Sequence, residues 1–263
     1  MKSLFFVFLV GFSFLGKTNE ITIAVENKPW EPYYSGKRKF DAKKPGVWIE
    51  LLKRVEKNLK SENLKIMYKR LPWKRCLTSL KSNYVDAVLG ASFKKSRMEV
   101  GEYPMNSGQP DNTMGVTNST YSFYKLKLGK IEWDGKKFLN LVGSRKIGVT
   151  AGYSIGDDLK KMNIRIHSGT HSKNVLEMVL KGRLSGFAGF TDITDSIIGK
   201  DKVKYSNVVK SKIPIKEKTY YLMLSKKLVQ TKESLAKKIW SEIKKVRSTQ
   251  AYLDLELEYR ESK

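Results

Sequence analysis

Residues 71–97 read LPWKRCLTSLKSNYVDAVLGASFKKSR and indicate the fold class. Apolar side chains recur at helical spacing over residues 73–80, a turn follows at 81–83, and the β-branched run at 85–89 is typical of a buried strand. Ser92 and Arg97 follow in a polar loop. In open α/β sheets, ligands bind beyond the carboxyl ends of the strands, so a hydroxyl and a guanidinium at this point predict an anion site.

The same alternation of strand and helix continues on both sides of this stretch. The predicted strands are 21–25, 64–70, 85–89, 146–149, 163–166, 186–190 and 220–224, and residues 98–103 are strand-like. The predicted helices are 46–59, 73–80, 155–162, 172–180 and 235–246. A strand, helix, strand order favours parallel sheets with right-handed crossovers, so the predicted fold class is α/β.

The charge of the chain is strongly positive. Its 263 residues include 51 Lys and Arg against 26 Asp and Glu, a net charge of +25. The cations lie singly or in pairs along the whole chain, without a basic tail or a nucleic-acid-binding module. Dispersed charge gives solubility but no sequence readout, so we expect a lysine-rich surface and no nucleic-acid partner.

The first residues predict export. Residues 1–16 combine a positive start with an apolar run that is too short to span a bilayer, as in a signal peptide; an uncleaved anchor or a buried strand is the alternative. No second apolar segment of membrane length follows. We therefore expect a periplasmic protein without stable membrane insertion. Cys76 is the only cysteine, which excludes an internal disulfide.

Two further segments carry candidate binding groups. Residues 26–36 form a loop with two prolines and three aromatic rings, in which Trp30 and Tyr33 either line a ligand or cap the core. Residues 150–158 form a Gly-rich turn in which Ser154 is a candidate N-cap for a helix whose free N–H groups attract anions; an ordinary capped helix is the alternative. The glycine spacing matches neither a dinucleotide fingerprint nor a P-loop, so no cofactor is predicted.

Metal binding is not predicted either. His167 and His171 are the two histidines of the chain, and no third ligand accompanies them in the sequence.

The order of several motifs is specific. The aromatic-proline loop, Gly46 before a helix, Ser92 with Arg97, and the turn Gly152-Tyr153-Ser154 follow one another as quoted. In this order the chain resembles the periplasmic solute-binding proteins of amino-acid-type importers, the bacterial extracellular solute-binding family 3. The resemblance implies a type II periplasmic-binding-protein fold, with two α/β lobes joined by two extended hinge crossovers.

The resemblance also implies a division of the chain. After the signal peptide, the first lobe would take residues 17–115, the second lobe 116–217, and the first lobe again 218–263. The crossovers would lie near 114–120 and 214–220.

Roles follow by position from the same resemblance. Arg97 matches the arginine that pairs with a ligand carboxylate, a bidentate contact that lysine would not reproduce. Ser92 and Lys94 match supporting positions, with Lys94 in place of the customary threonine. Gly152, Tyr153 and Ser154 match a turn of the second lobe that donates N–H groups to the same carboxylate.

The other end of the ligand is less defined. Trp30 or Tyr33 would stack on the ligand body, and Glu26 would meet its side chain. Amino-acid binders usually carry an aspartate for the ligand ammonium where this chain has Phe190, so either Asp192 fills that role or the ligand lacks the ammonium. Arg75 either reaches the cleft or stays in solvent.

The sequence thus predicts a monomeric, non-enzymatic receptor for a small carboxylate, an amino acid or a related polar acid, which delivers the ligand to an inner-membrane permease or acts with a sensor. Two alternatives stay open. One is a secreted lyase or hydrolase on the same fold, although the sequence offers no Ser-His-Asp order. The other is a binder of nucleic acid or anionic surfaces.

Overall fold

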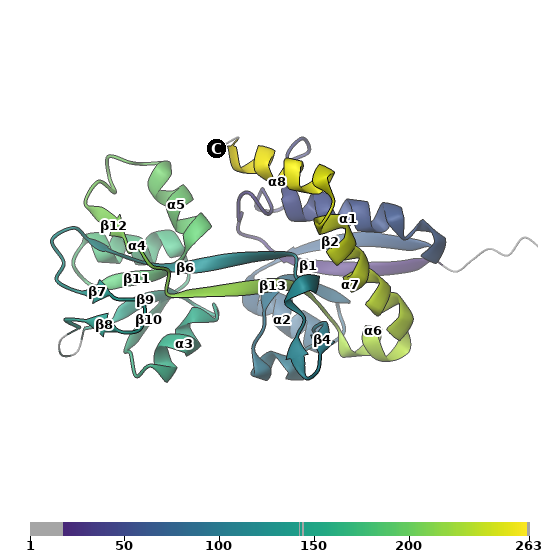
Figure 1. The fold of residues 1–263 in the computed structure, drawn as a ribbon, viewed down its shortest axis with the longest axis horizontal. Coiled ribbons are helices and arrows are strands. Elements are labelled where there is room, and N and C mark those ends of the chain that lie inside the picture. Colours follow the sequence, from purple (N-terminus) through teal and green to yellow (C-terminus); the bar gives the residue numbers. More distant parts are fainter. Residues whose placement is uncertain (1–17, 142, 144, 262–263) are drawn as a thin grey trace, which may run out of the picture.

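The computed structural model describes residues 18–141, 143 and 145–261. The predicted signal peptide, residues 1–16, lies outside this range. Figure 1 shows two α/β lobes, with strands β6 (Thr117–Leu126) and β13 (Lys216–Leu224) running side by side from one lobe to the other. These two strands pair in antiparallel register from Lys216 opposite Tyr121 to Tyr220 opposite Thr117.

The first lobe is built on parallel strands. Strand β1 pairs with β2 on one side and with β3 on the other. The bounds are β1 (Asn19–Glu26), α1 (Val47–Asn58), β2 (Leu64–Leu71), α2 (Trp73–Lys81) and β3 (Ala87–Ser92). Helix α1 buries six side chains on one face, and removing that apolar area from water fixes the helix against the sheet.

The second lobe repeats this scheme. Strand β9 pairs in parallel with β10 and β11, and β11 pairs antiparallel with β6. The bounds are β9 (Ile147–Thr150), α3 (Ile155–Lys161), β10 (Ile166–Gly169), α4 (Ser172–Leu180), β11 (Gly186–Phe190), α5 (Thr191–Gly199) and β12 (Val208–Lys210). The sheet is therefore continuous through the crossovers, in the order β10-β9-β11-β6-β13-β3-β1-β2.

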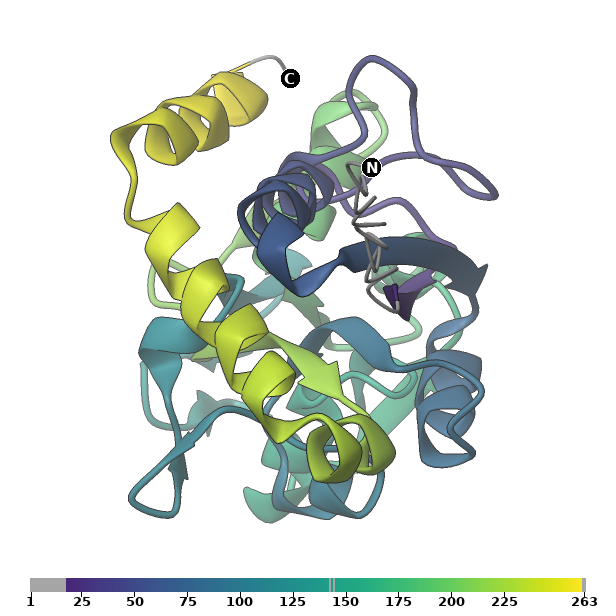
Figure 2. The same cartoon turned by 90° about the vertical axis from the view of Figure 1, so that its right-hand side faces the viewer.

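The C-terminal part of the chain returns to the first lobe. It comprises α6 (Lys226–Thr231), α7 (Glu233–Arg247) and α8 (Gln250–Glu261). Figure 2 shows α7 crossing the first lobe diagonally, and its buried stripe of Leu235, Ile239, Trp240, Ile243 and Val246 matches the predicted apolar face. Within the described part of the chain, no helix is both long and apolar enough to cross a bilayer.

Short elements fill the connections. They are the 3-10 turns η1 (Lys60–Glu62), η2 (Lys95–Glu99) and η3 (Asn112–Met114) and the paired strands β4 (Met105–Asn106), β5 (Gln109–Pro110), β7 (Glu132–Trp133) and β8 (Phe138–Leu139).

Two sequence predictions were wrong locally. Strand β10 begins at Ile166, where the predicted strand 163–166 ends, because Asn163 adopts a left-handed φ of 59° and closes the turn after α3. The strand-like residues 98–103 instead start inside η2 and make one isolated bridge, from Glu102 to Leu224.

Strand β3 carries a bulge next to the predicted anion site. Ala91 lies opposite Tyr221 and Leu89 lies opposite Leu222, so Gly90 is left without a partner across the ladder. Gly90 has a φ of 81°, which a glycine adopts without strain. The extra residue redirects the end of β3, where Ser92 lies.

Candidate functional site

The ends of the parallel strands meet across the two lobes. The Ser92 hydroxyl, at the end of β3, donates a hydrogen bond of 3.0 Å to the Ser154 hydroxyl. The Tyr153 hydroxyl donates one of 3.2 Å to the Glu26 carboxylate at the end of β1. The two lobes are therefore closed on each other around this point.

Arg97 lies at the centre of the contact. Its side chain is 6% exposed, and Nη1 donates to the carbonyl oxygen of Ser92 at 2.7 Å and to the Ser92 hydroxyl at 3.1 Å. Nη2 donates to the carbonyl oxygen of Gly152 at 3.2 Å, across the lobes. No carboxylate of the described residues lies within 4.0 Å of the guanidinium, so this buried cation lacks a counter-ion.

A small cavity adjoins Arg97, and we call it the inner cavity. Its volume is about 20 Å³, room for about one water molecule. Most of its wall is aromatic: Trp30, Tyr34, Trp73, Tyr121, Tyr153, Phe190 and Tyr220. The buried indole N–H groups of Trp30 and Trp73 have no acceptor among the described residues. The inner cavity therefore offers unused donors beside an uncompensated positive charge.

Glu26 is a buried acidic residue in the wall of the same inner cavity. The residue is 4% exposed, and its Oε1 atom has no hydrogen-bond partner in the described part of the chain; Lys28 Nζ lies 3.8 Å from that atom. Burial raises the pKa of Glu26 above its ordinary value of 4.5, and the charge of Lys28 opposes this effect. Oε1 is an acceptor without a donor.

The aromatic residues of the first loop divide between the two expected roles. Trp30 is 5% exposed and lines the inner cavity, while its ring packs edge-on against Phe190 at 4.2 Å and against Trp48 at 4.8 Å. Tyr33 is 1% exposed and stacks on Trp48 at 4.6 Å, so its ring belongs to the core. Phe190 closes the inner cavity with a phenyl ring at the position where the resemblance implied an aspartate.

Asp192 lies near the site but does not line the inner cavity. Its Oδ2 atom accepts hydrogen bonds from the Tyr33 hydroxyl at 2.7 Å and from the Ser119 hydroxyl at 3.0 Å. Because Tyr33 belongs to the first lobe and Asp192 to α5, this bond links the lobes. In this closed state, the two hydrogen bonds to Oδ2 hold the Asp192 carboxylate outside the inner cavity.

Two basic candidates lie further out. Arg75 is exposed on α2, because it follows the buried Trp73 by two positions and therefore lies about 200° around the helix from it. Lys94 forms an ion pair with Asp157 in the first turn of α3, which adds another contact between the lobes. Neither side chain lines the inner cavity.

The turn of the second lobe is arranged differently from the expectation. The Tyr153 N–H donates to the carbonyl oxygen of Thr150 at 3.1 Å, so it is engaged within the turn. Ser154 precedes α3, yet its hydroxyl makes no capping bond. That hydroxyl instead accepts hydrogen bonds from Ser92 and, at 2.8 Å, from Lys218.

Sequence reasoning missed the contribution of the crossover strands. Lys218 of β13 bonds Ser154 and forms an ion pair with Asp158, and burial lowers the pKa of its ammonium. Tyr121 of β6 and Tyr220 of β13 line the inner cavity with their hydroxyls 3.2 Å apart. The predicted strand 220–224 is buried at all five positions, so no alternation along it could single out Tyr220.

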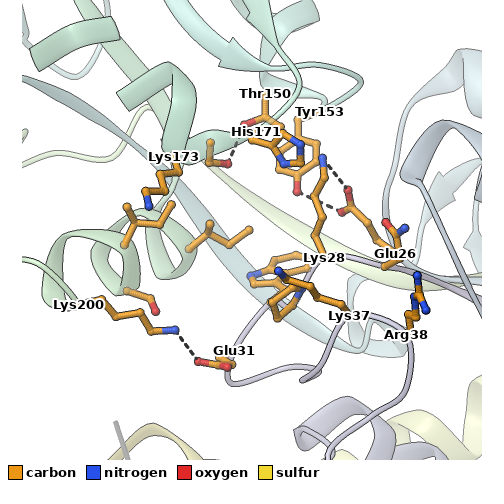
Figure 3. A pocket seen from close by; sticks show the side chains of 17 residues that line it. Glu26, Lys28, Glu31, Lys37, Arg38, Thr150, Tyr153, His171, Lys173 and Lys200 are labelled. Carbon is orange, nitrogen blue, oxygen red and sulfur yellow. Dashed lines mark hydrogen bonds and ion pairs between the residues drawn. The ribbon is translucent and has the colours of Figure 1, made fainter. Parts of the chain in front are cut away.

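A larger cavity opens on one side of the inner cavity, between the loop after β1 and helices α4 and α5; we call it the outer cleft. Its volume is about 590 Å³. Figure 3 shows its charged lining, and Glu26, Trp30 and Tyr153 form the wall that it shares with the inner cavity. Sequence reasoning identified neither the outer cleft nor its lysines as a site.

The histidines do not form a metal centre with acids or the cysteine. His167 lies in β10 and His171 immediately precedes α4. Among the described residues, no group of three His, Cys, Asp or Glu side chains is placed to hold a metal ion.

Comparison with solved structures defines the fold class. A histidine kinase sensor domain with similarity to periplasmic binding proteins superposes with a TM-score of 0.70 at 14% identity, covering 92% of this chain and 96% of that one. An arginine transport-system periplasmic binding protein from Legionella pneumophila gives 0.68 at 16% identity, covering 91% and 99%. An ancestral amino-acid-binding protein, a precursor of cyclohexadienyl dehydratase, gives 0.63 at 14%, covering 91% and 95%.

The chain therefore has the mixed α/β fold of the type II periplasmic binding proteins, and it matches the substrate-binding proteins of amino-acid transporters structurally at low sequence identity. These identities establish the fold. No family model matches the chain, and no curated relative matches it in sequence.

Proposed function

We propose that the protein is an extracytoplasmic solute-binding receptor that captures a small carboxylate ligand, an amino acid or a related polar acid, between its lobes. The observation that carries this proposal is Arg97, a 6% exposed guanidinium at the lobe contact without a carboxylate within 4.0 Å in the described part of the chain. A buried cation of this kind is stabilised by an anion that brings its own negative charge.

Glu26 supports an amino acid within this class. Its Oε1 atom lacks a donor and lines the same inner cavity as Arg97. A ligand with a carboxylate for Arg97 and an ammonium for Glu26 would satisfy both groups. Glu26, on the first lobe, would thus bind the ligand ammonium. Phe190 closes the inner cavity from the second lobe.

Ligand capture would act on the hinge. The lobes, proposed as 17–115 with 218–263 and as 116–217, touch through Ser92, Arg97 and their partners, and the inner cavity of about 20 Å³ is too small for an amino acid. The ligand would enter when the lobes part and would bridge them on closure. An inner-membrane permease or a sensor would then recognise the closed monomer.

Titration calorimetry with Arg97 variants tests the proposal. A thermal-shift screen of amino acids, dicarboxylates and short peptides first identifies the ligand, because a ligand stabilises the fold by mass action. Arg97→Ala should then lower its affinity by about 2 kcal/mol, roughly 30-fold, and Arg97→Lys should restore only part of it. The control is Lys181→Ala, which replaces an exposed lysine at the end of α4. Unchanged affinity in Arg97→Ala would contradict the proposed role.

A second candidate is a lyase or hydrolase on the same fold. The buried Glu26, whose pKa is raised, has the environment of a general acid or base, and one structurally similar protein is the precursor of a dehydratase. Incubation of the identified ligand with the protein, followed by mass spectrometry, separates the two. A receptor returns the ligand unchanged.

A further inference from the structure

We propose that the ligand carries a second anionic group and that the outer cleft holds this group between the two lobes. This inference rests on the proposed function, since it concerns the far end of the same ligand. It assigns the outer cleft as a subsite for the carboxylate or phosphate of an acidic amino acid or a similar dianion.

The charges of the outer cleft are not balanced. Five cationic and two acidic side chains line it. Each acid has a lysine beside it: Glu26 lies 3.8 Å from Lys28, and Glu31 lies 3.3 Å from Lys200. The three remaining cations have no acid within 4.0 Å among the described residues; they are Lys37, Arg38 and Lys173.

The unbalanced cations come from opposite lobes. Lys37 and Arg38 belong to the loop between β1 and α1, and Lys173 belongs to α4 of the second lobe. Figure 3 shows the side chains of Lys37 and Lys173 extending into the cavity from its two sides. Like charges on facing walls repel each other, so an anion between them would favour closure of the lobes.

Lys173 is also unfavourable for its own helix. It lies in the first turn of α4, which contains no acidic residue, and a cation there opposes the helix dipole. A residue that breaks a local rule without a structural gain is typical of a functional site. A bound anion would interact favourably with both Lys173 and the helix N-terminus.

The volumes of the two cavities indicate that the body of the ligand lies in the outer cleft. The inner cavity holds about 20 Å³ and the outer cleft about 590 Å³, and the two share Glu26, Trp30 and Tyr153. A ligand whose carboxylate reaches Arg97 therefore extends past Glu26 into the outer cleft. The buried Oε1 atom of Glu26, which has no partner in the described structure, lies on this route and accepts a hydrogen bond from the ligand.

Matched pairs of acids and ω-amides test the inference by calorimetry on the full chain. The probes are aspartate with asparagine, glutamate with glutamine, and 2-aminoadipate with its ω-amide, which differ within each pair only in the second charge. In at least one pair the acid should bind about tenfold more tightly than the amide. Lys173→Ala should reduce that preference to within about threefold, whereas Arg97→Ala should weaken acid and amide alike.

Lys181→Ala is the matched control, because Lys181 is an exposed lysine at the other end of α4. It should keep the preference for the acid. The melting temperature of ligand-free Lys173→Ala should stay level or rise, since the substitution removes a cation from the helix N-terminus.

Four results would overturn the inference. Equal binding of acid and amide in every pair would remove the second anionic group and leave the carboxylate receptor standing. A preference that survives Lys173→Ala, or a lowered melting temperature of that variant, would remove the assigned subsite. If no member of any pair binds, both this inference and an amino-acid ligand fail.

Discussion

Glu26 is expected to affect both ligand binding and the stability of the protein. Its carboxylate is buried at the end of β1, where it accepts a hydrogen bond from the Tyr153 hydroxyl and lies 3.8 Å from Lys28 Nζ. Burial raises the pKa of Glu26, so the folded protein disfavours the ionised form. The resulting cost to folding is present above the raised pKa and disappears as the pH falls through it.

Glu26→Gln should therefore raise the melting temperature near pH 8, and the gain should shrink as the pH falls toward about 4. The same variant should bind an ammonium-bearing ligand more weakly, because the amide removes the negative charge. Thermal melts across this pH range give the first result and calorimetry the second. Glu20→Gln, at an exposed position of the same strand, is the control. A lower melting temperature near pH 8 would contradict the effect of burial.

How far single residues could be predicted depends on whether their role is local. Ser92 ends β3 and Arg97 lies in the η2 turn just beyond it, so the local strand pattern was enough to place both near a strand end, while their role in binding an anion stays a prediction. Lys218 meets Ser154 only because β13 returns to the site after the second lobe is complete, and no local pattern encodes that meeting. The final position of Asp192, bonded to Tyr33, likewise depends on how the lobes close.

At the scale of elements, the junction between the aromatic loop and α1 depends on one glycine. Gly46 precedes α1 with a φ of 112°, and a Cβ atom there would lie 2.3 Å from the Cα of Tyr34 and 2.4 Å from the carbonyl oxygen of Tyr33. Both neighbours are backbone atoms, which cannot move aside without displacing the loop that carries Trp30.

Gly46→Ala should destabilise the protein by about 2 kcal/mol or more, because it combines a positive φ with a backbone clash. Urea denaturation measures the change. Gly199→Ala is the control: nothing lies within 4 Å of the position of its added Cβ atom, and it should stay close to the wild type. Equal stabilities of the two variants would show that the loop yields at little cost.

Elements with strong periodicity were predicted well, and those shaped by turns were not. The apolar stripe of α7 and the β-branched run of β1 carry their own signal, and both appear where they were expected. Strand β10 began later than predicted because the left-handed Asn163 extends the turn, a choice that the apolar pattern does not reveal. The η2 turn at 95–99 was missed because its only buried member is the charged Arg97.

The whole molecule is a closed pair of lobes that touch through the Trp30–Phe190 ring contact and through several hydrogen bonds. Among these hydrogen bonds, the Tyr33 hydroxyl donates to Asp192 at 2.7 Å across the lobes, whereas the Tyr33 ring packs on Trp48 within the first lobe. Because the ring and the hydroxyl have separate partners, the link between the lobes can be removed without emptying the core.

Tyr33→Phe should therefore shift the ligand-free protein toward an open form, by about 1 kcal/mol for one lost hydrogen bond. Small-angle X-ray scattering should show a larger radius of gyration than in the wild type, and saturating ligand should reverse the increase. Tyr221→Phe removes a hydroxyl bonded to Asn112 at 2.6 Å; Tyr221 does not line the inner cavity, and this variant should not change the radius. A radius that stays constant in Tyr33→Phe would show that this bond does not hold the lobes together.

The single cysteine makes these motions directly measurable. Cys76 is 0% exposed in α2, and burial raises the pKa of its thiol to about 12. Since the thiolate is the reactive form, the native thiol should resist alkylation by maleimide dyes at neutral pH. Two cysteines introduced at exposed positions, one on each lobe, would then carry a donor and an acceptor fluorophore without background labelling. The opening and closing of individual molecules could be followed by energy transfer, with the native sequence otherwise intact.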